Sequence, residues 1–372
     1  MHAMTQSGQP SNKTTTDRIA HLRDRIDRID QQVLELINQR LRVGKEIGDI
    51  KADRGTQVAD EARENLLIQR LLKLNTGPLT EGMLREIYRT VIAASRELQR
   101  HQRVAFLGPE ATFSHIAARH HFGPGVKLVP HTSIEDIFSD VEKEACDYGV
   151  VPVENSIEGS VNRTLDLLFE TRLVICAEKY QNISHDLLSI SGKLEDIKAI
   201  YSHDQALAQC RKWLRRHCPE AALKESSSTA EAARKAAENP AAAAIASREA
   251  GTLYQLKIVS PRIEDYPRNV TRFLVIGRDQ PSPTGNDKTS LMFVTSHIPG
   301  ALHHALQPIA DAGLNMVKLE SRPMKHENWS YFFFVDLEGH RTDRTVRETM
   351  DRMMPMCLYL KCAGSYPKGE KP

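Results

Sequence analysis

The chain has 372 residues, of which 40% are hydrophobic and 26% are charged, and its formal net charge is +2. These are ordinary values for a soluble globular protein, and the length allows two or three domains of about 150 residues each. The balanced charge argues against a nucleic-acid partner and against a membrane partner.

The N-terminus is rich in Ser, Thr, Gln and Asn and has no apolar segment. It is therefore predicted to be a disordered tail (1–16) and not a secretory signal. No run approaches the ~20 apolar residues that a membrane span needs. The six cysteines form no C-x-x-C pair, which favours reduced thiols, a cytoplasmic location and no metal site.

Residues 17–100 are predicted to be helical throughout. Three helices are expected: one that starts at Asp17 and breaks near 53–55, one over about 60–74, and one capped by Thr80. In the first helix, apolar residues recur at three- and four-residue spacing along its whole length. Two short helices cannot bury the far end of so long a partner. We therefore expect an intertwined homodimer, or a higher homo-oligomer, in this region.

Charge on the first helix suggests an anion site. Arg40 and Lys51 are eleven residues apart, so at ~100° per residue they share one face. Gly44 and Gly48 lie between them on the same side, although a glycine within a helix costs ~1 kcal/mol relative to alanine. The residues alone leave two interpretations open: a cavity for a compact anion, or solvated cations beside closely packed helices.

Residues 103–280 alternate β-rich runs with helical stretches, which predicts an α/β fold. Strands are expected at 104–107, 148–151, 199–201 and 273–276. Three motifs lie at predicted strand ends, where open α/β sheets place ligand sites: 108–115, 151–160 and 269–273. Taken singly, the first is as compatible with a structural turn as with an anion site, and the third with a polar lead-in to a strand.

A Pro-, Ser- and Gly-rich linker is expected at 279–287, and a third domain at 288–366. The third domain is predicted to have the βαββαβ order of a ferredoxin-like fold. The segment after Tyr366 is expected to be disordered.

The helical region resembles the all-helical class of chorismate mutases. Eight polar residues match the family's active-site positions: Arg23, Arg40, Lys51, Asp60, Arg63, Glu64, Ser95 and Gln99. The resemblance implies that Arg23 reaches into the partner subunit's site and that the arginines bind the carboxylates of chorismate. It also implies that Lys51 and Gln99 donate to the ether oxygen and that Glu64 takes the ring hydroxyl. This pericyclic rearrangement to prephenate needs no cofactor.

Residues 103–280 resemble prephenate dehydratase, which implies two α/β lobes of the periplasmic-binding type around a cleft. Thr271 in Thr-Arg-Phe matches the family's essential threonine, and the other matched positions are Glu154, Asn155, Ser156, Ser202, His203 and 225–229. Thr271 is expected to act on the departing hydroxyl of prephenate. Arg272 is expected either to bind a carboxylate or to be structural. Three histidines are acid candidates on chemistry alone, ranked below Thr271: His115, His185 and His203. Ala111 stands where many members have glycine.

The last domain resembles the ACT domain of this enzyme class. Two motifs match its phenylalanine-binding segments, with the residues Gly300, Ala301, Leu302, Glu320, Ser321, Arg322 and Pro323. The resemblance implies that L-phenylalanine binds between paired domains and lowers dehydratase activity. The alternative for this domain is a dimerisation module.

Three other interpretations of the whole chain agree less well with its residues. One is a dehydratase whose helical part only dimerises; another is a non-catalytic amino-acid sensor built on a binding-protein cleft. The intact mutase positions argue against the first, and Thr271 with 154–156 argues against the second. A nucleic-acid binder is disfavoured because acids interrupt the basic residues of the first helix. The expected function is conversion of chorismate to prephenate and then to phenylpyruvate, CO2 and water.

Overall fold

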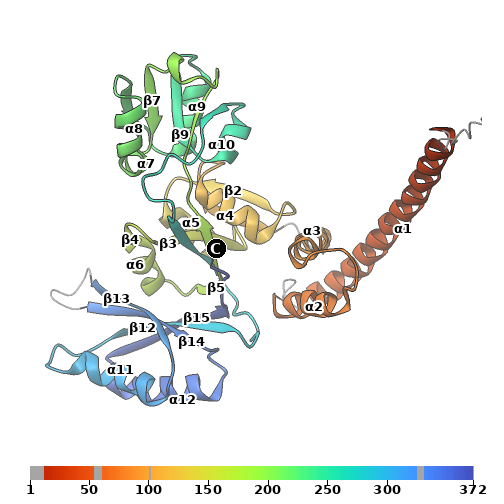
Figure 1. The fold of residues 1–372 in the computed structure, drawn as a ribbon. Coiled ribbons are helices and arrows are strands. Elements are labelled where there is room, and N and C mark those ends of the chain that lie inside the picture. The colour runs from red at the N-terminus through yellow and green to blue at the C-terminus, as the bar shows by residue number, and fades with distance from the viewer. Residues whose placement is uncertain (1–11, 54–60, 100–101, 325–330, 372) are drawn as a thin grey trace, which may run out of the picture.

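The computed structural model describes residues 12–53, 61–99, 102–324 and 331–371. Figure 1 shows a helical arm, a two-lobed α/β part and a C-terminal α/β part. The arm consists of α1 (Asn12–Asp53), α2 (Glu61–Leu74) and α3 (Glu81–Gln99). Thr80 caps α3 as predicted, because its Oγ1 accepts a hydrogen bond from the Met83 amide at 3.3 Å. Asp17, however, lies within α1 and is not its N-cap. The helix already begins at Asn12, and no Pro or Gly lies between Asn12 and Asp17.

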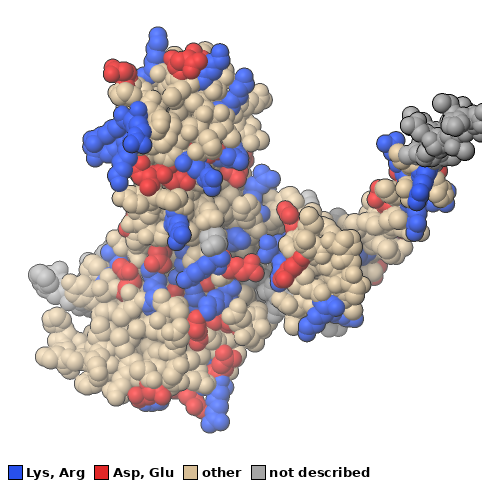
Figure 2. All heavy atoms as spheres, viewed as in Figure 1, with Lys and Arg blue, Asp and Glu red and all other residues tan. Residues whose placement is uncertain are grey.

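The long helix α1 leaves much of its apolar face uncovered. Its C-terminal part packs with α3, on which α2 also packs, while the rest projects away from them (Figure 1). Ile26 is 56% exposed and Leu36 is 63% exposed. Figure 2 shows that much of the visible surface of α1 carries neither acidic nor basic side chains. None of the helices in the described part of the chain has both the length and the hydrophobicity that crossing a membrane requires.

The first lobe is built on a mixed sheet with the strand order β2-β1-β3-β11-β5, and β4 pairs with β3. β1, β2 and β3 are parallel, and β11 runs antiparallel between β3 and β5. Its elements are β1 (Arg103–Leu107), α4 (Phe113–Phe122), β2 (Lys127–His131), α5 (Ile134–Glu142), β3 (Tyr148–Asn155), β4 (Gly159–Ser160), α6 (Asn162–Glu170), β5 (Val174–Asn182) and β11 (Val270–Gly277). Because the chain leaves this lobe after β5 and returns at β11, two segments connect the lobes.

The second lobe has the strand order β10-β6-β9-β7-β8. Its elements are β6 (Asp186–Ser189), η1 (Leu194–Asp196), β7 (Ala199–Ser202), α7 (Asp204–Gln209), α8 (Arg211–His217), β8 (Ala222–Glu225), α9 (Thr229–Ala237), β9 (Ala242–Ala246), α10 (Arg248–Leu253) and β10 (Lys257–Ser260). All five residues of β9 are buried, and α9 packs on it through buried alanines. Small side chains on both elements let the helix approach the sheet closely.

The C-terminal part is an antiparallel sheet of order β13-β14-β12-β15 with two helices, as the predicted βαββαβ pattern requires. Its elements are β12 (Asp287–Val294), α11 (Ala301–Asp311), β13 (Met316–Pro323), β14 (Tyr331–Glu338), α12 (Arg344–Met353), η2 (Met354–Met356) and β15 (Tyr359–Pro367). The expectation of disorder after Tyr366 is wrong for the next residues. β15 continues to Pro367, and the Lys368 amide donates to the Asn286 carbonyl at 2.9 Å.

The C-terminal sheet shares one hydrophobic core with the first lobe, to which Met292, Phe332 and Phe334 contribute beside Leu165 and Leu168. An ionic contact accompanies this packing. Arg272 of β11 is buried and donates to Glu178 of β5, to Asp336 of β14 and to the Tyr366 hydroxyl of β15. The two parts are therefore docked by both apolar and charged contacts.

Gly364 of β15 packs directly against the backbone of β5 in this interface. A Cβ at this position would lie 2.7 Å from the Ile175 amide nitrogen and would also meet the Ile175 carbonyl oxygen. We predict that Gly364→Ala lowers the free energy of unfolding by about 1–3 kcal/mol, because backbone cannot yield as a flexible side chain can. Chemical denaturation would measure it. Gly82→Ala is the control: it has nothing within 4 Å and should stabilise α3 by up to about 1 kcal/mol.

Candidate active site

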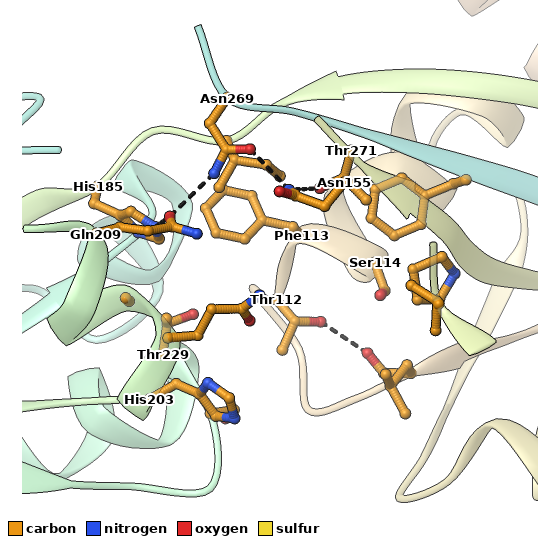
Figure 3. Close-up of a pocket in the computed structure, with 18 of the residues that line it drawn as sticks. Thr112, Phe113, Ser114, Asn155, His185, His203, Gln209, Thr229, Asn269 and Thr271 are labelled. Atoms are coloured by element: carbon orange, nitrogen blue, oxygen red, sulfur yellow. Dashed lines mark hydrogen bonds between the residues drawn. The ribbon is translucent and has the colours of Figure 1, made fainter. Parts of the chain in front are cut away.

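A cleft of about 370 Å³ lies between the two α/β lobes. The first lobe contributes Thr112, Ser114, Asn155 and Thr271, and the second contributes Gln209 and the segment 227–229. Figure 3 shows Thr271, Asn155 and Asn269 on one wall, with Thr229 and His203 across the cavity from them. The lining mixes apolar and polar side chains and is nearly uncharged: among the described lining residues none is Lys, Arg, Asp or Glu.

Four polar side chains form a continuous chain of hydrogen bonds along one wall (Figure 3). Asn155 Nδ2 donates to Thr271 Oγ1 at 2.8 Å and to Asn269 Oδ1 at 2.7 Å. Asn269 Nδ2 in turn donates to Gln209 Oε1 at 3.0 Å. Because the Thr271 oxygen accepts from Asn155, its own proton is left to donate toward the cleft.

Further hydrogen bonds determine which way the side-chain amides of Asn155 and Gln209 point. Asn155 Oδ1 accepts from the backbone amides of Ile157 and Glu158, so its Nδ2 must face Thr271. Gln209 Nε2 donates to Glu158 Oε1 at 2.9 Å, which turns its oxygen toward Asn269. The register of β11 on β3 places Thr271 opposite Asn155, which brings the two together.

His185 is buried at the same wall of the cleft. Its tautomer follows from its hydrogen bond to Gln209. Its Nε2 lies 3.1 Å from Gln209 Oε1, which accepts but cannot donate, so the neutral ring carries its proton on Nε2. Nδ1 then has no hydrogen-bond partner among the described residues. Burial lowers the pKa of His185 below its ordinary value, with the Gln209 hydrogen bond acting in the opposite direction. The imidazole is therefore neutral at pH 7.

Helix N-termini supply positive potential to the cleft from both lobes. In the first lobe Thr112 caps α4, and its Oγ1 accepts from the His115 amide. In the second lobe Ser228 caps α9 in the same way. Such N-termini favour anions through their backbone N–H groups and dipole. The cleft can thus attract a compound with two negative groups without a basic side chain.

Ala111, just before α4, adopts φ 62. This is the left-handed conformation, which glycine adopts at no steric cost and other residues adopt only rarely. The loop nevertheless keeps this conformation, with the Ala111 amide donating to His115 Nδ1 at 3.0 Å. His115 is thereby engaged in the loop, and burial lowers its pKa.

The structure brings only part of the predicted dehydratase residues to the cleft. Asn155, His203 and Thr271 line it. Ser202 is buried, and its Oγ donates to the Ile245 carbonyl instead. Glu154, Ser156 and Arg272 line a different cavity, of about 360 Å³, that faces the C-terminal sheet. The reason is the alternation of a strand: neighbours of Asn155 and Thr271 point to the opposite side.

Gln209 was missed by the sequence analysis. It lies on α7, on the side that also buries Ala206. A polar residue on the buried face of a short helix is the signal that could have identified it. Asn269 was included only as part of the 269–273 motif, without a role.

The helical arm places the predicted mutase residues on all three helices. Arg40 is half-buried and its Nη1 donates to the Val91 carbonyl of α3 at 3.5 Å, one turn before the buried Ser95. Arg63 is exposed and Glu64 half-buried at the start of α2. Arg23 is exposed on α1. Asp60 lies outside the described residues, as do the side chains of Lys51 and Gln99.

Arg23 and Arg40 cannot serve one site within a single chain. They are 17 positions apart on one helix, which corresponds to about 26 Å at a rise of 1.5 Å per residue. Within one chain, Arg40 is instead close to α3. The arm therefore holds two separated parts of a candidate site.

The two predicted phenylalanine motifs fall on different elements. Gly300 has φ 81 and precedes α11, which starts at Ala301. Glu320, Ser321, Arg322 and Pro323 form the end of β13. Glu320 accepts from Ser160 at 2.9 Å and Arg322 pairs with Asp166 at 3.1 Å, so both contact the first lobe.

One group of potential metal ligands occurs in the described part of the chain. The ligand atoms of His131, Asp140 and Cys146 lie within 4.8 Å of one another. These three residues are not among the residues that line the cleft. None of the six cysteines, all of which lie in the described part of the chain, forms a disulfide.

Three family models match the chain. Chorismate mutase type II matches residues 22–100, prephenate dehydratase matches 104–281, and the ACT domain matches 289–352. Together they account for the arm, the two-lobed part and the C-terminal part.

Among curated proteins, the bifunctional chorismate mutase/prephenate dehydratase of Aquifex aeolicus is 42% identical over 95% of this chain and 98% of its own length. A solved structure of prephenate dehydratase in complex with L-Phe from Arthrobacter aurescens is 34% identical, with a TM-score of 0.66, over 72% of this chain and 90% of that one. A quorum quenching acylase, GqqA, is 30% identical, with a TM-score of 0.65, over 72% of this chain and 97% of that one.

The buried neutral His185 predicts a loss of stability in mild acid. Its folded pKa lies below the ordinary value of 6.5, so the unfolded chain binds the extra proton and stability falls as pH drops below about 6.5. Between pH 7.5 and 5.5 the loss should be at most about 1.4 kcal/mol, the limit for a group that stays neutral in the folded chain. Denaturant unfolding of the wild type and His185→Gln at pH 7.5 and 5.5 would measure it. Equal pH dependence in the two proteins would contradict the assignment.

Proposed function

The chain belongs to the family of bifunctional chorismate mutase/prephenate dehydratases, and on that premise we propose how its residues divide the work. It is an enzyme of phenylalanine biosynthesis that isomerises chorismate to prephenate and converts prephenate to phenylpyruvate, CO2 and water. We assign the first reaction to 17–100, the second to 103–280 and regulation to 288–366. The observation that carries the dehydratase assignment is the Thr271 hydroxyl held by Asn155 inside the cleft.

Prephenate conversion breaks two bonds of one ring. The bond to the ring hydroxyl breaks and the oxygen leaves as water after gaining a proton. The bond to the ring carboxylate also breaks, and its electron pair enters the ring as CO2 departs. Thr271 is oriented to donate a hydrogen bond to the departing hydroxyl, because Asn155 occupies its acceptor side. His185 is neutral and buried on the same wall, where it holds Gln209 rather than supplying a proton.

The carboxylates of prephenate are proposed to bind at the helix N-termini that Thr112 and Ser228 cap, one in each lobe. A ligand bound at both ends would hold the lobes together. His203 lines the same cleft and can donate to the ligand from the second lobe. Glu154, Ser156 and Arg272 face the C-terminal sheet, and we assign them a structural role.

For the mutase reaction we propose that Arg40, Arg63 and the partner subunit's copy of Arg23 bind the carboxylates. Lys51 and Gln99 donate to the ether oxygen, and Glu64 takes the ring hydroxyl; Asp60 and Ser95 complete the pocket. Support comes from Arg40, which contacts α3 beside the buried Ser95. No metal or cofactor takes part in this proposal.

We infer that the arm dimerises. The supporting observation is the row of exposed apolar residues that α1 presents along its length: Ile19, Leu22, Ile26, Ile29, Val33, Leu34 and Leu36. Together they would leave a large apolar surface in water, which soluble monomers rarely carry. A second copy would cover it and supply the distant Arg23.

The ACT domain fits feedback regulation by L-phenylalanine. We propose that the amino acid binds at 300–302 and 320–323, between paired ACT domains. The exposed side of β13 supports such pairing, since Val317 and Leu319 are apolar and about two-fifths exposed. We also propose a cytoplasmic location, which agrees with six cysteines that form no disulfide.

The dehydratase assignment predicts that Thr271→Val, which keeps shape but removes the hydroxyl, lowers kcat for prephenate by about a hundredfold or more. Thr271→Ser should retain most activity. Chorismate turnover by the same protein is the internal control and should not change. Retention of prephenate turnover by the valine variant would refute the role of Thr271.

The mutase assignment makes the reciprocal prediction. Arg40→Met should lower kcat/KM for chorismate by about tenfold to a hundredfold, the worth of a hydrogen bond to a charged group. Conversion of added prephenate should stay at the wild-type rate. If chorismate turnover also stays, the arm is a dimerisation module and not a catalyst.

A further inference from the structure

Alternate residues of β13 face the first lobe. Lys318, Glu320 and Arg322 are half-buried, whereas Leu319 and Ser321 between them are exposed. Lys318 Nζ lies 3.0 Å from a Glu154 carboxylate oxygen and donates to Ser160 Oγ at 3.0 Å. Ser160 in turn donates to Glu320. The strand that carries the second phenylalanine motif is thus joined to β3, to β4 and, through Arg322, to α6.

Lys318 is the central residue of this contact. Its side chain is only 8% exposed, and a buried ammonium is tolerated only when it is paired. Its carboxylate and hydroxyl partners stand opposite each other, because Glu154 and Ser160 are register partners in the β3–β4 pair. One ammonium group therefore holds both strands of this hairpin.

The same hairpin carries Asn155, which lines the cleft beside Thr271. Glu154 and Asn155 are successive residues that face opposite sides of β3, and Arg272 and Thr271 are successive residues of the neighbouring β11. A shift of the backbone at Glu154 therefore moves the Asn155 amide relative to the Thr271 hydroxyl, which it holds at 2.8 Å.

Close packing does not fix β13 at this point. A cavity of about 360 Å³, to which Glu154, Arg272 and Lys318 contribute, separates the two parts here. Elsewhere the interface is tightly packed: Phe169 and Phe332, for example, stack with their ring centroids 4.6 Å apart. The position of β13 over the hairpin thus depends on its polar contacts.

We propose that Lys318 is a positioning residue of the dehydratase site, contributed by the ACT domain, and that it transmits phenylalanine inhibition. Phenylalanine that engages Glu320 or Arg322 competes with their contacts to Ser160 and Asp166. It thereby displaces β13, and Lys318 passes the displacement to Glu154 and Asn155. The inhibitory half of this inference rests on the proposed binding of phenylalanine; the positioning half does not.

The test compares three variants of the full-length protein. Lys318→Met removes the ammonium, Lys318→Arg keeps a cation, and Lys361→Met removes another interface lysine. Lys361 donates from β15 to the Leu168 carbonyl near the end of α6, so its loss weakens docking without touching the hairpin. Each protein is assayed for prephenate kcat and KM, for chorismate turnover, for the half-inhibitory phenylalanine concentration and for phenylalanine binding by calorimetry.

Lys318→Met should lower prephenate kcat by about tenfold or more, because small misplacements of catalytic groups are costly. Its KM and chorismate turnover should stay near wild type. Its half-inhibitory phenylalanine concentration should rise while calorimetry still detects binding. Lys318→Arg should restore both properties in large part, and Lys361→Met should change neither.

An unchanged kcat in Lys318→Met would overturn the positioning role, as would an equal loss in Lys361→Met. Unchanged inhibition in Lys318→Met would overturn the transmission role. If phenylalanine neither binds nor inhibits the wild type, the proposed feedback fails instead, and the kcat comparison still decides whether Lys318 positions the site.

Discussion

The buried guanidinium of Arg272 is the constraint on which the rest of the molecule depends. A charge so deeply buried is tolerated only if it is paired, and its partners come from two parts of the chain: Glu178 from the first lobe, Asp336 and Tyr366 from the C-terminal sheet. The strand that carries Thr271 on one face therefore carries on the other a charge that the C-terminal domain must satisfy. The charge of Arg272 is thus fully paired only when the C-terminal domain is docked.

Much of this architecture could be predicted from the sequence, because strand and helix periodicities are local. Thr80 capping α3 and Thr271 lying at a cleft are examples. The failures have one physical origin. A run such as 154–156 is contiguous in sequence, but a strand sends its alternate side chains to opposite faces, so polar neighbours cannot all serve one ligand. Gln209 came from a separate lobe, and only the tertiary fold brings it to Asn269.

The nearly uncharged cleft suits a reaction that destroys a carboxylate. A lysine or arginine paired with that group would stabilise the substrate more than the transition state, in which the negative charge is moving into the ring. The helix N-termini at Thr112 and Ser228, where we propose that prephenate binds, would attract a dianion more weakly and over a wider area. The hydrogen-bonded side-chain amides of Asn155, Asn269 and Gln209 fix the position of the Thr271 hydroxyl, which the helix N-termini do not.

The separation of Arg23 and Arg40 along α1 has a consequence for how each activity depends on the concentration of the protein. If the arm dimerises as we propose, a lone chain holds only parts of the site for the first reaction but, with its own two lobes, a whole cleft for the second. By mass action the first activity then rises with the square of protein concentration when the protein is scarce, whereas the second rises in proportion. At low expression the chain would consume prephenate faster than it makes it, so the intermediate would not accumulate.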